Sequence, residues 1–254
     1  MLPRPGDGST SRLSLSFVRW FGRRSTGSEG SRVRSRNVAE LPVDRVALHD
    51  VDIDPEALLA RAAYVQLGQF TALSRAAAEA PTVEAKGALA DAAGRLLQTH
   101  RSLVAALERR GRTASEAMAP FVAETDRFFA TVSGANWHEA LTSAYLVDGL
   151  LDDFYARLIG GVAPDGAELA KQLRGPRATN EIVTILSAAI AADPRLGSRL
   201  AVWGRRLVGD TLLCARAALP ETVRTEAGEA RVEPVLTELM AEHTRRMDRL
   251  GLTA

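Results

Sequence analysis

Four polar residues occupy positions where helical spacing places them among apolar side chains. Gln66 shares a heptad-spaced stripe with leucine, alanine and phenylalanine, and His100 lies on a similar stripe in the segment that follows. Asp148 lies among leucine, valine and tyrosine residues, and Asp152 is one helical turn further on. An imidazole and carboxylates that face one interior are suited to holding a transition metal or to forming a buried hydrogen-bond network. Both interpretations stay open on these residues alone.

The elements that would position these residues are long helices with clear start and stop signals. Asp54 and Pro55 are typical of a helix start, and Gly111 is typical of a helix end. A short break at Pro81 makes the first two helices antiparallel neighbours. We expect helices over about 54–80, 83–110, 136–159, 179–192, 193–220 and 233–250. We also expect a connecting helix interrupted near Pro120, a broken stretch before residue 179 and a polar loop over 221–230.

The composition favours an all-α fold in a reducing compartment. Aromatic residues make up only 5% of the chain, while alanine and leucine recur throughout. The single cysteine, Cys214, excludes an internal disulfide and a cysteine-rich metal site, and its apolar surroundings predict a small core residue. The chain has no run of about 18 apolar residues, so no transmembrane segment is predicted. No signal peptide is evident. We therefore expect a cytoplasmic protein.

Residues 1–45 differ in composition from the rest of the chain. They hold nine arginines, four acidic residues, eight serines and five glycines, which predicts a disordered basic tail. Because the whole chain carries a formal charge of +1 and the tail carries +5, the remaining residues carry −4. This acidic balance argues against a dedicated nucleic-acid-binding domain. We expect one folded domain over 46–254.

Several long motifs resemble a known family. The chain is similar, over about 50–252, to actinobacterial ferritin-like proteins related to the tRNA hydroxylase MiaE, which modifies an adenosine beside the anticodon. The resemblance implies an all-α, ferritin-like helical bundle with additional C-terminal helices. The motifs that carry it are AYVQLGQF, EAMAPFVAETDRFFA, AYLVDGLLDDFYARL, AAIAADPRLGSRLAVWGRRLVGD and AEHTRRMDRLGL.

The resemblance also implies a pair of irons, but the ligands that would hold them are mostly replaced. In such bundles two helices each give a glutamate and two others each give an E-x-x-H motif, and this chain contains no E-x-x-H. By the resemblance, Gln66 and Leu97 stand where glutamates would be, while His100 and Asp148 retain ligand-type side chains. In the fourth helix Ala178, Asn180 and Thr184 stand where ligands are expected, and Glu181 is off register. We therefore expect neither a metal nor another cofactor.

Three functions follow as expectations. The first is a noncatalytic binding or assembly partner, as a homodimer or as a heteromer with a related ferritin-like protein, with Gln66, Leu97, His100, Asp148 and Asp152 as a vestigial site or polar core cluster. The second is an oxygenase or tRNA hydroxylase with an altered iron site at His100, Asp148 and Asp152. The third is binding of RNA such as tRNA without catalysis. The basic tail or two groups of arginines would contact the RNA. The first group is Arg109, Arg110 and Arg112, and the second is Arg205 and Arg206.

Overall fold

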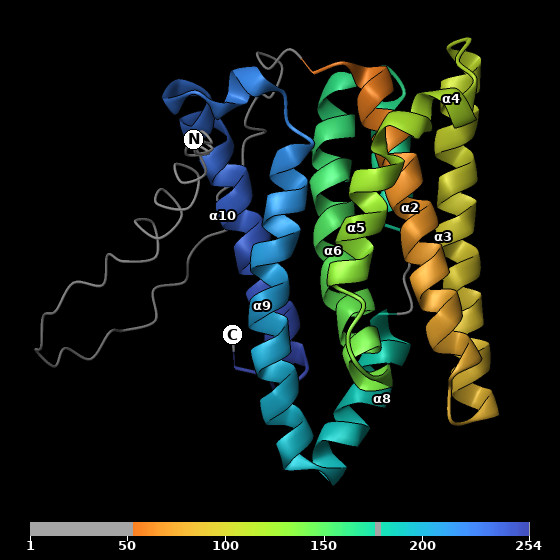
Figure 1. Cartoon of the computed structure of the whole chain (residues 1–254), viewed down its shortest axis with the longest axis vertical. Helices are drawn as coiled ribbons and strands as arrows, with labels where there is room; N and C mark the ends of the chain where they lie inside the picture. Colours follow the sequence, from red (N-terminus) through yellow and green to blue (C-terminus); the bar gives the residue numbers. More distant parts are fainter. Residues whose placement is uncertain (1–52, 176–178, 254) are drawn as a thin grey trace, which may run out of the picture. The chain divides into compact units, whose positions relative to one another are not determined.

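A computed structural model describes residues 53–175 and 179–253, and these residues form helices and no strand (Figure 1). The predicted basic tail, residues 1–45, lies outside the described residues. The all-α class is therefore confirmed for the part of the chain that is described. Its helices are α2 (Pro55–Ala78), α3 (Val83–Arg109), α4 (Ala114–Met118), α5 (Val122–Thr131), α6 (Trp137–Val162), α7 (Gly166–Leu173), α8 (Thr179–Ala192), α9 (Pro194–Ala217) and α10 (Glu226–Arg249).

Capping side chains explain where the long helices begin. The Asp54 carboxylate accepts a hydrogen bond from the backbone N–H of Glu56, and the Thr82 hydroxyl accepts one from Ala85 at 3.1 Å. Asp193 caps α9 in the same way. The predicted starts of these helices are confirmed to within one or two residues.

The ends and connections also follow the expected signals. Gly111, just past the end of α3, has a φ of +73°, a conformation that favours glycine over other residues. The predicted connecting helix is confirmed as α4, a single 3-10 turn at Ala119–Phe121, and α5. Pro120 lies in that turn, because its ring removes a backbone donor and disfavours an uninterrupted α-helix.

Two segments differ from expectation. The stretch before residue 179 contains a helix, α7, whose buried residues include Leu169, Ala170 and Leu173. The last helix begins at Glu226, seven residues before the predicted start, because the Thr225 hydroxyl caps it by accepting from Gly228 at 3.2 Å. Most of the expected polar loop over 221–230 is therefore helical.

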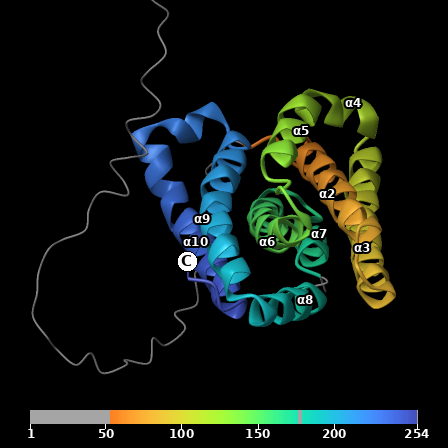
Figure 2. The ribbon, with the colours of Figure 1, turned by 60° about the horizontal axis from the view of Figure 1, so that its bottom comes forward.

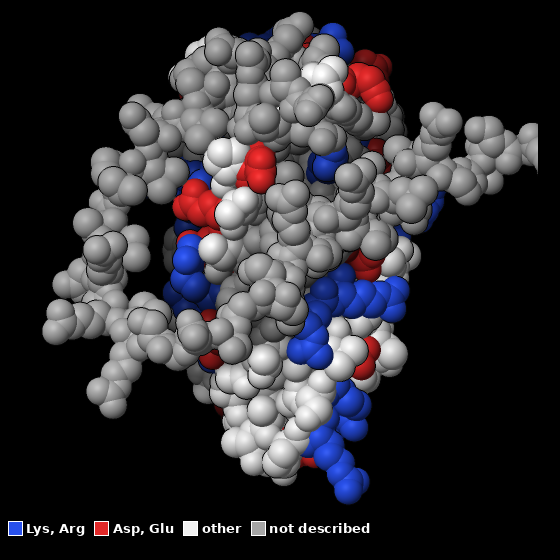
Figure 3. All heavy atoms as spheres, turned by 90° about the vertical axis from the view of Figure 1, so that its left-hand side faces the viewer, with Lys and Arg blue, Asp and Glu red and all other residues white. Residues whose placement is uncertain are grey.

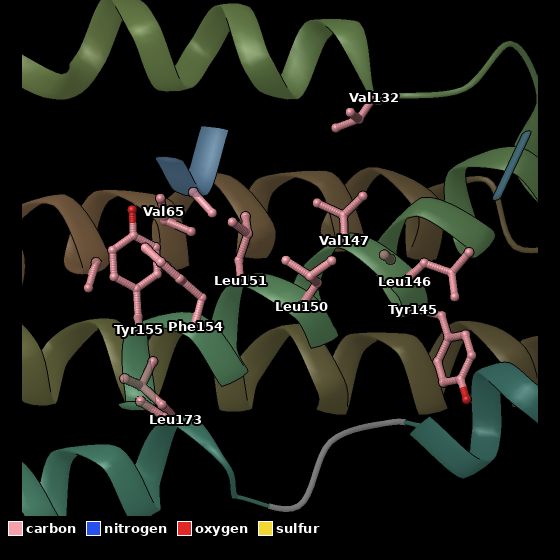
Figure 4. Close-up of a cluster of buried hydrophobic side chains, with 14 of the residues drawn as sticks. Val65, Val132, Tyr145, Leu146, Val147, Leu150, Leu151, Phe154, Tyr155 and Leu173 are labelled. Atoms are coloured by element: carbon pink, nitrogen blue, oxygen red, sulfur yellow. The ribbon is translucent and has the colours of Figure 1, made fainter. Parts of the chain in front are cut away.

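Helix α6 is the centre of this bundle. It packs against α2 on one side and against α9 and α10 on the other, and α2 pairs with α3 (Figure 2). Every residue from Leu141 to Asp152 is buried, as expected for a helix that is covered on all sides. Figure 4 shows apolar side chains that leave α6 in several directions, among them Leu146, Leu150 and Phe154. The two helices α9 and α10 are thus extra layers on the face of α6 away from α3.

No helix among the described residues is long and apolar enough to cross a membrane.

Candidate functional site

A buried polar cluster joins α2 to α6 in the middle of the bundle. The Gln66 side-chain amide donates to Asp152 Oδ1 at 2.5 Å and to Gln69 Oε1 at 2.7 Å. The Gln69 amide donates to the same Asp152 oxygen at 3.3 Å. All three side chains are at most 2% exposed. The cluster satisfies polar groups that would otherwise be costly to bury.

Helical spacing places the members of this cluster together. Gln66 and Gln69 are three residues apart on α2, so both face α6. Asp148 and Asp152 are four residues apart on α6, and Asp148 is 7% exposed. Gln69 was not among the residues singled out from the sequence. Its position one turn after Gln66, on a face already identified as apolar, was the signal that would have found it.

A cavity of about 60 Å³ lies beside the cluster. This volume corresponds to roughly four to six water positions. It brings together side chains from six helices, α2, α3, α6, α7, α8 and α10. The lining residues are Gln66, Leu73, Ala92, Arg95, Leu96, Thr99, Ala144, Tyr145, Asp148, Gly149, Asp152, Gln172, Leu173, Gly175, Ile182 and Arg246.

The cavity wall has both positive and negative groups. Asp148 and Asp152 are on the α6 side, while Arg95 comes from α3 and Arg246 from α10. The Arg246 Nη2 atom donates to Asp153, so this guanidinium is held in place by an ion pair. Within the described part of the chain, the buried atoms Arg95 Nε and Arg246 Nη1 have no hydrogen-bond partner.

Two further polar residues complete this wall. Gln172 of α7 has a buried Oε1 with no hydrogen-bond partner among the described residues. Burial raises the pKa of Tyr145 above its usual range, although Arg249 partly opposes that shift. The Tyr145 hydroxyl therefore stays protonated at neutral pH.

The structure separates the five residues singled out from the sequence. Gln66, Asp148 and Asp152 line the cavity, but Leu97 and His100 do not. His100 is half-buried, and its Nδ1 lies 2.8 Å from the backbone oxygen of Ala63. His100 was expected to face the same interior as the carboxylates, but its ring contacts the backbone of α2 and does not join them.

The predicted fourth-helix positions that the structure describes are also away from the cavity. Ala178 lies outside the described residues. Asn180, Glu181 and Thr184 are exposed, and the Thr184 hydroxyl donates to the Asn180 backbone oxygen at 2.8 Å. From α8, only Ile182 lines the cavity. The side chain that this helix contributes is therefore apolar and is not one of the positions considered as ligands.

These residues do not fit the pair of irons that ferritin-like oxygenases hold. Such a centre needs several carboxylates and histidines that face one another, whereas neutral amides at Gln66 and Gln69 face Asp152. Over residues 53–175 and 179–253, no group of three or more histidine, cysteine, aspartate or glutamate side chains is placed to hold a metal ion. Asp152 Oδ1 already accepts from both amides.

Cys214 is half-buried beside the core, in agreement with its expected packing role. Burial raises the pKa of its thiol to about 12. Because the thiolate is the reactive form, this environment does not favour a nucleophile.

The arginines considered for RNA contacts already have partners within the protein. Arg109 and Arg110 both pair with Asp165, and Arg112 pairs with Glu56. Arg205 donates to the Thr253 backbone oxygen at 2.7 Å. On the face shown in Figure 3, both basic and acidic side chains occur among the described residues.

The second arginine pair includes a residue that stacks on an aromatic ring. Arg206 pairs with Asp210 and lies 5.3 Å from the centre of the Trp203 ring. Trp203 packs against the core, and its Nε1 donates to the Ser143 hydroxyl at 3.0 Å. Trp203 is thus the core anchor that its apolar stripe predicts.

Comparison with known proteins gives one result at the level of the family. The ferritin-like domain of actinomycetes matches residues 52–224, which include the polar cluster and most of the helices. A comparison with curated proteins gives no match. Because the family match covers well over half of the 254 residues, the chain belongs to the actinomycete family of ferritin-like domains.

Proposed function

We propose that this chain is a noncatalytic member of the ferritin-like family that acts as a binding or assembly partner. The observation that carries the proposal is the buried hydrogen-bonded cluster of Gln66, Gln69 and Asp152. Two of its three members are amides, which do not supply the negative charge that a pair of irons requires. The fold keeps its stability without that centre because apolar packing around α6 holds the helices together.

The sequence motifs that resemble the MiaE group support a role beside a metal-containing relative of this chain. In this proposal the chain forms a homodimer, or a heteromer with a related ferritin-like protein. The partner supplies any chemistry, and this chain contributes a bundle of matching shape. We propose no cofactor for this chain.

The test measures molar mass by light scattering during size-exclusion chromatography. The chain is purified alone and after co-expression with a metal-containing ferritin-like protein from the same organism. A dimer mass, or a stable complex with that relative, is the expected result. A monomer in both preparations would contradict the assembly role.

One observation favours a second function. Asp148 and Asp152 both line one cavity from α6, so two carboxylates lie on the same wall. An oxygenase or tRNA hydroxylase with an altered iron site would use them, although His100 lies apart from that cavity. Deletion of the gene followed by analysis of modified tRNA nucleosides separates the two functions. Loss of a hydroxylated nucleoside would support the oxygenase, and an unchanged profile supports the noncatalytic role.

A further inference from the structure

We propose that the cavity between α2, α3, α6, α7, α8 and α10 binds a small zwitterion, a molecule with one carboxylate and one ammonium group, such as a small amino acid. The inference rests on the proposed function, because it assigns an organic ligand to the place where a ferritin-like oxygenase would hold iron. It adds a ligand class that the family match does not specify.

The size of the cavity limits the ligand to a few atoms. About 60 Å³ accommodates roughly four to six water-sized groups, which is the size of glycine, alanine or β-alanine. Leu73, Ala92 and Ile182 form apolar parts of the same wall.

Two arginine side chains of the wall are suited to binding a carboxylate. Arg95 Nε and Arg246 Nη1 are buried donors, and the described residues offer them no acceptor. Guanidinium groups bind carboxylates through short, charge-assisted hydrogen bonds. Because Arg246 is fixed by its ion pair with Asp153, its remaining donor is already oriented before a ligand arrives.

A close approach of α10 to α6 brings Arg246 to this wall. A Cβ atom built on Gly149 would lie 2.5 Å from Arg246 Nε and 2.8 Å from its Cζ. Any larger residue at position 149 would therefore displace the guanidinium. Glycine at this position of α6 is thus what allows the arginine to lie against the helix.

Other side chains of the same wall are suited to binding an ammonium group. Gln172 Oε1 is a buried acceptor that no described residue satisfies, and the carboxylates of Asp148 and Asp152 lie in the same wall. Both carboxylates also take part in other interactions, but each has lone pairs for more than one donor. An ammonium group supplies three N–H donors.

The mixed charge of the wall selects a zwitterion over a singly charged ligand. A simple carboxylate would meet Asp148 and Asp152, and a simple amine would meet Arg95 and Arg246. A molecule with both charges can pair with the arginines and with the acceptor groups, and it brings no net charge into the site.

The test is isothermal titration calorimetry on the full chain with glycine, alanine and β-alanine, and with acetate and methylammonium for comparison. We expect at least one zwitterion to bind at least about tenfold more tightly than acetate and methylammonium. Equal affinities for zwitterions and singly charged probes would overturn the proposal. So would the absence of heat from every zwitterion.

Two variants place the ligand in the cavity. Arg95→Met removes a guanidinium from the wall, and Arg199→Met is the control, because Arg199 is an exposed residue of α9 outside the cavity. We expect at least a tenfold loss of affinity in Arg95→Met and none in Arg199→Met. Equal affinity in both variants would overturn the assignment.

Circular dichroism checks that Arg95→Met is folded. If it is not, Gln172→Leu provides the same test from α7, because it removes the unpaired acceptor from a half-buried position. Loss of affinity in Gln172→Leu is expected, and wild-type affinity would overturn the proposal. If the protein takes up no iron and binds none of the zwitterions, this inference alone is contradicted. If the protein takes up iron, the proposed function is contradicted.

Discussion

Gln66 on α2 donates a hydrogen bond of 2.5 Å to Asp152 on α6, and both side chains are buried. The amide of Gln69 reaches the same carboxylate oxygen. A buried carboxylate needs such donors, because an unsatisfied charge in the core is costly. The contact therefore ties the α2–α3 pair to the central helix and also decides what the centre of the bundle can bind.

Replacing Gln66 by glutamate should destabilise the protein at neutral pH. The substitution Gln66→Glu removes the donor to Asp152 and places a second negative charge beside it. We expect a loss of roughly 2–4 kcal/mol in the free energy of unfolding at pH 7. The loss should become smaller at pH 5, because one of the two carboxyl groups can then be protonated and donate to the other. Urea unfolding measures both values.

The control for this variant is Gln98→Glu, at an exposed position of α3. It makes the same chemical change away from the core, so we expect less than about 0.5 kcal/mol. Equal losses in the two variants, or a loss in Gln66→Glu that grows as the pH falls, would contradict the account of the cluster.

Two glycines on α9 should respond in opposite ways to alanine. A Cβ on Gly204 would lie 2.3 Å from the sulfur of Met247, a side chain of α10 that is fully buried. We expect Gly204→Ala to cost about 1–3 kcal/mol, because the packed methionine has little room to move. Gly209 has no atom within 4 Å of its Cβ position, and Gly209→Ala should stabilise the helix by about 0.5–1 kcal/mol. Thermal unfolding that shifts both variants in the same direction would show that α10 does not pack against α9 as described.

The buried imidazole of His243 should make the protein less stable in mild acid. Burial lowers the pKa of His243 from 6.5 to about 4. Between these values the unfolded chain takes up a proton that the folded chain does not, so stability falls as the pH drops from about 6.5 to about 4. The shift corresponds to roughly 3 kcal/mol over that range.

Denaturant unfolding at a series of pH values measures this loss. The variant His243→Gln should lose this component of the pH dependence. His138→Gln, which changes a half-buried histidine of α6, serves as the control and should keep it. A wild-type pH profile in His243→Gln would disprove the assignment to this residue.

The thiol of Cys214 should be unreactive in the folded protein. Burial raises its pKa to about 12 from an ordinary value of 9.0, which lowers the thiolate fraction at pH 8 about a thousandfold. Labelling with a disulfide reagent should be slow in buffer and complete in guanidinium chloride. Because Cys214 is the single cysteine, one thiol per chain should react on unfolding. Rapid labelling of the native protein would contradict the packing of α9.

Much of the fold could be predicted because local signals mark its boundaries. The bounds of α2 and α3 were predicted to within about two residues. The signals were the caps at Asp54 and Thr82 and the glycine at Gly111. The start of α10 could not be found this way, because its first turns are polar and Pro234 lies within the helix. Tertiary packing of Val232 and Val235 against the core outweighs that unfavourable local pattern.

The site could be predicted only in part. Helical periodicity identified Gln66, Asp148 and Asp152 as inward-facing residues, and the structure brings them to one cavity. It could not separate His100 from them, because periodicity gives the face of a helix but not the atom that a side chain contacts. Arg95 and Arg246 were missed for a related reason. Long side chains reach the cavity from half-buried positions that carry no apolar pattern.

The absence of an iron pair in this chain is the central claim of the proposed function. The most direct test loads the purified chain with ferrous iron without oxygen, removes free metal by desalting and measures retained iron by plasma mass spectrometry. His100→Ala is measured in parallel. We predict far less than one iron per chain in both proteins, because Asp152 is committed to Gln66 and Gln69. About two irons per chain, lost in His100→Ala, would contradict the account and make oxygenase chemistry the leading function.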